Sequence, residues 1–133
     1  MSNTLTKVQD ANARRGGDVL LEVLESEGVE YIFGNPGTTE LPLMDALLRR
    51  PKVSYILALQ EASAVAMADG YAQASGKPGF LNLHTAGGLG HGNGALHNPA
   101  STQTPLQVTA GQQDTPHCMP APRLHRDRCK YAN

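Results

Sequence analysis

Apolar and polar positions along the chain follow two periods in turn. Residues 16–30 repeat apolar side chains every three to four positions, which predicts a helix with Val19, Leu20, Val23 and Leu24 on its buried face. Further helices of this period are predicted over residues 38–50, 60–76 and 89–101.

Between these helices lie short segments that are apolar at nearly every position. Such segments, bounded by glycine and proline, predict strands that are buried on both faces. Each predicted strand starts roughly 25 residues after the one before it, which is about the length of a strand, a crossover helix and short loops. The sequence therefore predicts an α/β fold, in which helices cover both faces of a parallel sheet. The predicted strands are residues 29–37, 52–59, 78–85 and 104–111.

Polar residues and glycines gather where the predicted strands end. In chain order, these segments read GNPGTTE, LQEAS, HTAGGLGHGNG and AGQQD. Open parallel sheets bind ligands beyond the carboxyl ends of their strands, so these segments are the candidate site. Asn, Gly and Thr also make turns and helix caps, and a purely structural role for them stays open.

Glu61 stands at the junction between an apolar strand and an alanine-rich helix. A glutamate in the first turn of a helix gains about 0.3–1 kcal/mol from the helix dipole, which is the structural explanation. The apolar strand and the small side chains after it also predict tight packing with little water. Burial of this kind raises the pKa of a carboxyl group and lets it hold a proton near neutral pH. Glu61 is therefore also a candidate acid–base residue.

Charge and composition restrict the classes of function. The 133-residue chain has a formal net charge of −1, which gives no electrostatic case for binding nucleic acid or an acidic membrane surface. Its first residues contain no apolar stretch typical of a signal peptide or membrane span, so a cytoplasmic location is expected. Cys118 and Cys129 lie near the end of the sequence and are given no structural role. Chemistry on a small molecule is the function that these features favour.

Three longer blocks of sequence carry a family pattern. They read FGNPGTTELPLMDAL, YILALQEASAVAMADGYAQASGKPGFLNLHTAGG and PLQVTAGQQ. Together they resemble the amino-terminal, pyrimidine-binding domain of thiamine diphosphate enzymes, most closely the benzoylformate decarboxylase type. The resemblance runs from about residue 18 to residue 114, in the family's order and spacing, and is more specific than any single short motif.

The resemblance assigns roles to residues at the predicted strand ends. The family's glutamate after the second strand hydrogen-bonds N1′ of the cofactor aminopyrimidine and activates the cofactor, and Glu61 occupies that position. Thr38 falls where benzoylformate decarboxylase has a serine that contacts the substrate carboxylate. His84 matches a histidine assigned to proton transfer, although a single histidine at a strand end is otherwise more often structural. The implied cofactor-binding residues are Asn35, Pro36, Gly37 and Glu61.

The reaction implied by the resemblance is decarboxylation of a 2-oxo acid, with thiamine diphosphate as electron sink. Family enzymes hold this cofactor between the pyrimidine-binding domain and a diphosphate domain of another subunit, which supplies Mg²⁺ ligands through a Gly-Asp-Gly motif and a downstream asparagine. The sequence contains no Gly-Asp-Gly. Mg²⁺ ligands are therefore expected on a domain outside this sequence, no metal site is predicted within it, and the family implies a homodimer or homotetramer.

Three alternative functions stay open. Acetolactate synthases share the general pattern but have Gly-Pro-Gly and no histidine after the third strand, so a carboligase domain ranks below a decarboxylase. A non-catalytic cofactor-binding domain fits an incomplete cofactor site. GHGNGA, residues 90–95, fits a dinucleotide-binding fingerprint, but it follows the third predicted strand rather than the first. The remaining histidines and cysteines are assigned no chemical role; they are His91, His97, His117, Cys118, His125 and Cys129.

The sequence divides into three predicted segments. Residues 1–16 are expected to form a flexible amino terminus, residues 17–114 an incomplete pyrimidine-binding domain, and residues 115–133 an irregular, disordered tail. The family pattern stops abruptly after Asp114, where prolines and arginines follow, as a frameshift or an incomplete gene would leave it. The chain by itself is therefore expected to be inactive.

Overall fold

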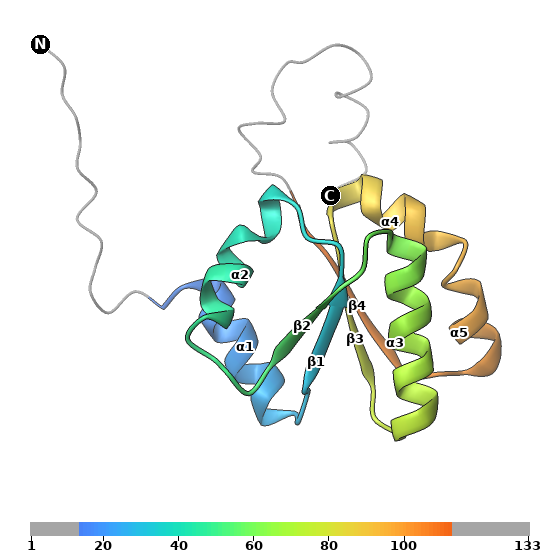
Figure 1. The fold of residues 1–133 in the computed structure, drawn as a ribbon, viewed down its shortest axis with the longest axis horizontal. Coiled ribbons are helices and arrows are strands. Elements are labelled where there is room, and N and C mark those ends of the chain that lie inside the picture. Colours follow the sequence, from blue (N-terminus) through green and yellow to red (C-terminus); the bar gives the residue numbers. More distant parts are fainter. Residues whose placement is uncertain (1–13, 113–133) are drawn as a thin grey trace, which may run out of the picture.

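The structure, a computed structural model, describes residues 14–112, which form a four-stranded sheet (Figure 1). The strands are β1 (Tyr31–Gly34), β2 (Ser54–Leu57), β3 (Gly79–Leu83) and β4 (Leu106–Ala110). Their order across the sheet is β2-β1-β3-β4, and every neighbouring pair is parallel. The predicted fold class and the four predicted strands are confirmed.

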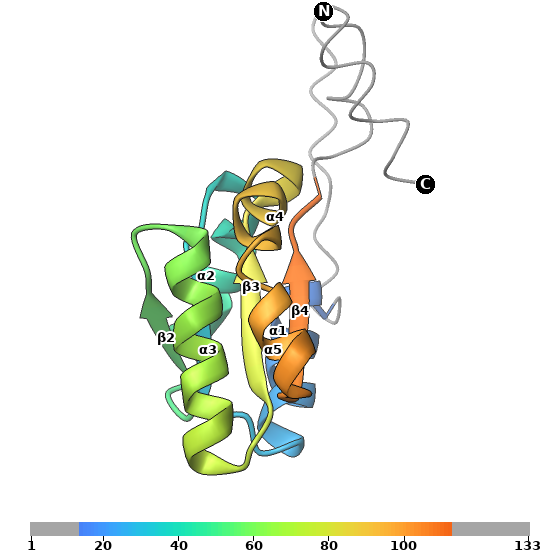
Figure 2. The same ribbon diagram turned by 90° about the vertical axis from the view of Figure 1, so that its right-hand side faces the viewer.

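Helices connect consecutive strands and cover both faces of the sheet. Their bounds are α1 (Gly16–Ser26), the 3₁₀ turn η1 (Thr38–Glu40), α2 (Leu41–Leu47), α3 (Glu61–Ser75), α4 (Thr85–Asn93) and α5 (His97–Thr102). In Figure 1, α1 and α2 lie on one side of the sheet and α3, α4 and α5 on the other. Figure 2 shows these last three helices in front of the sheet. Right-handed crossovers explain the arrangement, because the chain moves in opposite directions across the sheet before and after β2.

Alternate strand residues supply two apolar cores, one on each side of the sheet. Ile32 of β1 packs in the core beneath α1 and α2, and the next residue, Phe33, packs in the core beneath α3. All five residues of β3 are buried, as expected for a central strand covered on both faces.

The buried face of α1 differs from the predicted one. Leu24 is buried and Leu20 is half-buried, as predicted, but Val19 and Val23 are 37% and 51% exposed. Leu21 is completely buried in their place. Because α1 packs against α2 as well as against the sheet, tertiary contacts set its rotation, and the periodicity of its own sequence does not contain them.

The glycine-rich helix predicted over residues 89–101 is two helices. The first, α4, starts directly after His84, earlier than predicted, and α5 begins only at His97. Pro99 favours this break, because it has no N–H to donate to the carbonyl of Ala95, and it lies instead in the first turn of α5, where no such bond is needed.

Several predictions about the chain ends lie outside the described residues. They concern residues 1–13 of the expected flexible terminus and the whole of residues 115–133, including both cysteines. Within the expected flexible terminus, Arg15 pairs with Asp45 at 3.1 Å, and Gly16 already belongs to α1. None of the helices within residues 14–112 has the length and apolar character needed to cross a membrane.

Candidate functional site

The carboxyl ends of β1 and β3 form the edge where the candidate residues gather. From β1 the chain passes to β2 on one side and then crosses to β3 on the other side. Such a reversal of strand order opens a crevice between the loops, where parallel sheets bind ligands. Asn35 follows β1, His84 follows β3, and Glu61 begins α3 after β2.

Glu61 is buried in the first turn of α3. Its side chain is 9% exposed, and Asn35 donates a hydrogen bond from Nδ2 to its Oε1 at 3.2 Å. Gln60, rather than Glu61, provides the side-chain cap of the helix by accepting the backbone N–H of Ser63 at 3.0 Å. The carboxylate of Glu61 is therefore tied to the loop after β1.

The pKa of Glu61 is shifted in the direction opposite to the prediction. Burial acts to raise this pKa, as expected, but hydrogen bonds from its own backbone N–H and from Asn35, together with the nearby ring of His91, outweigh burial. The pKa of Glu61 therefore lies below its ordinary value, and the prediction of a raised pKa is wrong for this chain. At neutral pH the group is an ionised hydrogen-bond acceptor.

His91 contacts Glu61, which sequence reasoning did not anticipate. Its Nδ1 lies 3.5 Å from Glu61 Oε2, although 73% of its side chain is exposed. Glycine at position 92 lets α4 pack closely against α3, since a Cβ there would lie 3.3 Å from Leu83 Cδ1 and 3.4 Å from Val65 Cγ2. His97, in contrast, is exposed, and its ring contacts Ser101 of its own helix.

A second buried carboxylate, Glu40, lies beside His84. Its Oε2 is 2.8 Å from His84 Nδ1, and its side chain is 1% exposed. Thr39 donates its hydroxyl to Glu40 Oε1 at 2.6 Å and also lies 3.1 Å from His84 Nδ1. Sequence reasoning missed Glu40. The sequence signal for it was a Gly-x-x-Glu spacing at a helix start. This spacing is half of a capping box, in which the glutamate accepts the N–H of the first residue, as Glu40 does from Gly37 at 2.8 Å.

The loop after β1 supplies contacts to both carboxylates. Asn35 reaches Glu61, and the N–H of Gly37 reaches Glu40. Pro36 is half-buried between them. A side chain at Gly37 would overlap the ring of His84, so glycine is needed there for the close approach of the ring.

The two threonines of this loop are placed differently. Thr38 is exposed, and its hydroxyl has no hydrogen-bond partner among residues 14–112. Thr39 is half-buried and engaged with Glu40 and His84. Thr38 is therefore the threonine that is free to contact a ligand.

Gly88 of α4 brings the two carboxylate clusters into one site. A Cβ at Gly88 would lie 3.3 Å from Glu61 Oε1 and 3.5 Å from the Cβ of His84. Thr85, the residue after His84, has a φ of 51°, a left-handed conformation that is strained for a β-branched residue. Glu61, His84 and Asn35 thus lie at one edge, and a strained residue follows the histidine.

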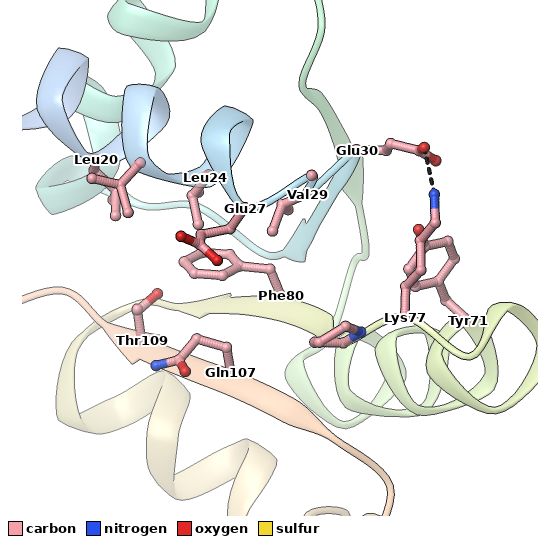
Figure 3. Close-up of a pocket in the computed structure, with 13 residues that line it drawn as sticks. Leu20, Leu24, Glu27, Val29, Glu30, Tyr71, Lys77, Phe80, Gln107 and Thr109 are labelled. Carbon is pink, nitrogen blue, oxygen red and sulfur yellow. Dashed lines mark hydrogen bonds and ion pairs between the residues drawn. The ribbon is translucent and has the colours of Figure 1, made fainter.

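A cavity lies elsewhere on the molecule (Figure 3). It has a volume of about 670 Å³ and opens between α1 and the sheet, toward the strands' amino ends. Leu24 and Phe80 line it, and Lys77 and Glu30 pair at one end at 2.6 Å. It contains none of the predicted site residues. The carboxyl-edge cluster is the better candidate site, because buried carboxylates and a histidine converge there at the strands' carboxyl ends.

Two further sequence predictions concern phosphate and metal binding. Residues 90–95 lie in the second half of α4 and the turn after it, so they do not form the strand-to-helix turn that binds a dinucleotide. The dinucleotide-binding alternative is therefore wrong. In the part of the chain that the structure describes, no three His, Cys, Asp or Glu side chains are placed to hold a metal ion.

Comparison with known proteins identifies the family. The family model described as "Thiamine pyrophosphate enzyme, N-terminal TPP binding domain" matches residues 14–126. The chain belongs to the thiamine pyrophosphate enzymes. Thiamine pyrophosphate is thiamine diphosphate, so the resemblance seen in the sequence is confirmed, and the match covers the N-terminal TPP-binding domain.

Relatives with two different activities match this TPP-binding domain. Benzoylformate decarboxylase of Pseudomonas aeruginosa is 49% identical over 92 residues, which are 69% of this chain and 17% of that protein. The acetolactate synthase large subunit of Haemophilus influenzae is 33% identical over 97 residues, 73% of this chain and 17% of that protein. Benzoylformate decarboxylase from Polynucleobacter necessarius has a crystal structure that matches with a TM-score of 0.73 at 39% identity, over 84% of this chain and 21% of that one.

The TPP-binding domain spans about a fifth of the length of these relatives. Identity is higher to the decarboxylase than to the synthase, in line with the resemblance to the benzoylformate decarboxylase type. Both reaction classes are nevertheless represented among its relatives.

Proposed function

We propose that this domain binds and activates the aminopyrimidine of thiamine diphosphate in an enzyme that decarboxylates a 2-oxo acid. The observation that carries the proposal is the buried carboxylate of Glu61, oriented by Asn35 at the carboxyl edge of the sheet. The 49% identity to a benzoylformate decarboxylase supports the reaction class.

The surroundings of Glu61 suit an aminopyrimidine ring. Within residues 14–112 no lysine or arginine pairs with this carboxylate, so it is free to accept a hydrogen bond from a ligand. Gly88 leaves the space beside Oε1 open, since a side chain there would begin only 3.3 Å from that oxygen. Both features support a flat ring that donates an N–H as the ligand of this carboxylate.

Glu61 and the loop after β1 have separate roles in binding the cofactor. When bound, thiamine diphosphate supplies the electron sink for the carbanion that forms as carbon dioxide leaves the substrate. Glu61 would accept the N1′–H that the aminopyrimidine carries in its imino form, and Asn35 holds the carboxylate in one orientation. Low exposure of Glu61 excludes water from this hydrogen bond and so strengthens it. Pro36 and Gly37 continue the loop that carries Asn35.

Thr38 and His84 are assigned to the substrate. The exposed hydroxyl of Thr38 is free to donate a hydrogen bond to the substrate carboxylate. The proposal assigns to His84 the movement of a proton to or from the reacting group, which its one-third exposure and its position close to Gly88, beside Glu61, support.

Mg²⁺ and the diphosphate of the cofactor need ligands of their own. The proposal assigns them to a diphosphate domain outside this sequence, in a homodimer or homotetramer, as the family resemblance implies. The chain itself contributes the pyrimidine side of the site.

A carboligase of the acetolactate synthase type is the second candidate, because such synthases are among the relatives. His84 favours the decarboxylase, since the family pattern of acetolactate synthases lacks this histidine. The two candidates differ in product. A decarboxylase releases an aldehyde from one 2-oxo acid, whereas the carboligase joins the decarboxylated unit to a second 2-oxo acid.

The experiment that tests the proposal is hydrogen–deuterium exchange at C2 of the cofactor, in a chimera that joins this domain to the remaining domains of a benzoylformate decarboxylase. We expect Glu61→Gln to slow the exchange by about 100-fold or more, because an amide cannot take up and release the proton that an acid–base residue handles. Glu30→Gln, exposed and distant from the site, is the matched control and should keep the parent rate. A Glu61→Gln chimera with the parent rate contradicts the proposal.

A further inference from the structure

Glu40 is a buried carboxylate for which the proposed function has no role. Its side chain is 1% exposed, and its one ion-pair partner among residues 14–112 is His84. A buried carboxylate is costly unless donors meet its oxygens. The donors around Glu40 therefore show how its buried charge is stabilised.

Three groups approach the carboxylate of Glu40. Gly37 donates its N–H to Oε2 at 2.8 Å, and Thr39 donates its hydroxyl to Oε1 at 2.6 Å. The third group is His84, whose Nδ1 lies 2.8 Å from Oε2. Because an ionised carboxylate offers acceptor sites only, Nδ1 is the donor in this contact.

The hydrogen count at Thr39 leads to the same assignment. Its hydroxyl has one hydrogen, which is given to Glu40 Oε1, so it presents only lone pairs to His84 Nδ1 at 3.1 Å. A bare Nδ1 would face lone pairs from both Glu40 and Thr39, which is repulsive. The hydrogen of a neutral His84 ring therefore lies on Nδ1, and Nε2 carries a lone pair.

Backbone packing holds this arrangement in place. A Cβ at Gly111, just after β4, would overlap Glu40 Oε1 and Thr39 Oγ1. A Cβ at Gly37 would overlap the ring of His84. With glycine backbones on two sides, the three side chains have little room for other rotamers.

We propose that Glu40 is a positioning residue that fixes His84 in the Nδ1–H tautomer and orients its ring. Nε2 is then the nitrogen that takes up and releases a proton at the carboxyl edge of the sheet. A carboxylate in this position also stabilises the protonated ring as it forms. The catalytic consequence rests on the proposed role of His84, whereas the tautomer is a property of the chain itself.

The tautomer is tested on the 133-residue chain without cofactor. Its histidines are labelled with ¹⁵N, and spectra are recorded near about pH 8, where an unperturbed histidine is neutral. The ¹⁵N shifts report which ring nitrogen carries the hydrogen. We expect hydrogen on Nδ1 of His84, and a wild-type ring with hydrogen on Nε2 overturns the inference. This reading needs no variant, so it decides the matter even where a substitution prevents folding.

Glu40→Ala is the variant that removes the positioning group. In it, the Thr39 hydroxyl is released and can donate to Nδ1 of His84, so we expect the ring hydrogen to move to Nε2. Glu30→Ala, an exposed glutamate on the other edge of the sheet, is the control and should leave the His84 tautomer unchanged. A folded Glu40→Ala chain that keeps hydrogen on Nδ1 contradicts the inference.

A double-mutant cycle in the chimera tests the catalytic consequence. We expect Glu40→Ala to lower kcat by about 10-fold or more in the parent, and by less than about 2-fold when His84→Ala is already present, because Glu40 acts through His84. Equal losses in both backgrounds would mean that Glu40 does not act through this ring. A chimera without decarboxylase activity contradicts the proposed function alone, since the tautomer is read without cofactor.

Discussion

Two buried carboxylates at the carboxyl edge of the sheet differ in what holds them. Glu61 is met by the amide of Asn35 and the ring of His91, which leaves it able to accept a ligand hydrogen. Glu40 is fully occupied by donors from its own loop and from His84. At the scale of single residues, the first carboxylate is suited to binding and the second to orienting a neighbour.

The lowered pKa of Glu61 makes a prediction about its partners. Asn35→Ala and His91→Ala each remove a group that lowers this pKa, while the burial that raises it remains. We expect the pKa of Glu61 to rise in both variants, measured by ¹³C NMR titration of its carboxyl carbon. His97→Ala, which removes an exposed histidine far from Glu61, should leave the pKa unchanged. A pKa that stays or falls in both variants would contradict the assignment.

The same shift predicts a pH dependence of stability. Because the folded pKa of Glu61 lies below its unfolded value of about 4.3, this group stabilises the fold above that pH, and the contribution is lost as the pH falls through the folded pKa. Asn35→Ala should therefore flatten the acid side of the stability profile. Urea unfolding between about pH 3 and pH 7 measures this, and an acid limb of unchanged slope would contradict it.

At the scale of elements, small residues decide how closely the helices approach one another. Gly17 of α1 faces α2, where a Cβ would lie 2.8 Å from the carbonyl oxygen of Pro42 and 3.3 Å from the Cβ of Ala46. The neighbouring Gly16 has no atom within 4 Å of such a Cβ. These adjacent glycines of one helix form a matched pair, one packed and one open.

Substitution of this pair separates packing from helix propensity. We expect Gly17→Ala to lower the free energy of unfolding by about 1–3 kcal/mol, because the backbone of α2 must move to admit the methyl group. Gly16→Ala should be neutral or stabilising by up to about 1 kcal/mol, since alanine favours helix without a clash. Urea unfolding of both variants gives the comparison, and equal effects would show that α1 and α2 are not in close contact.

At the scale of the whole molecule, the proposed function assigns one side of a cofactor site to the described residues. In the proposed function Glu61 binds the pyrimidine, and within residues 14–112 no cluster of side chains is placed to hold the metal that a diphosphate group requires. The charge of the diphosphate must be neutralised before the cofactor can leave water. The proposed function therefore requires groups outside the described residues to complete the site.

This dependence predicts weak cofactor binding by the 133-residue chain alone. With excess Mg²⁺, we expect calorimetric titration with thiamine diphosphate to give no stoichiometric isotherm at micromolar concentrations, and we expect no decarboxylase activity. The chimera used above is the positive control. A one-to-one micromolar isotherm from the isolated chain would show that it holds the diphosphate by itself.

The sequence by itself determined the four strands, their parallel pairing and the edge where the candidate site residues gather. Local periodicity distinguishes strand from helix, and the spacing of the strands requires parallel pairing, so the four strands followed from the sequence. Two things sufficed to place Glu61, Asn35 and His84 at the carboxyl ends of the strands. One is the rule that parallel sheets bind ligands at those ends, and the other is the family pattern. Both kinds of signal are carried by residues that are near one another in the chain.

The tertiary structure alone decided the rotation of α1, the direction of the Glu61 pKa shift and the partners of the two carboxylates. Glu40 and His84 lie 44 positions apart in the chain, and Asn35 and Glu61 lie 26 apart. Contacts of this range depend on how helices pack across the sheet. Burial alone predicted a raised pKa, but the donors that the fold brings to Glu61 outweigh burial, and no local pattern encodes them.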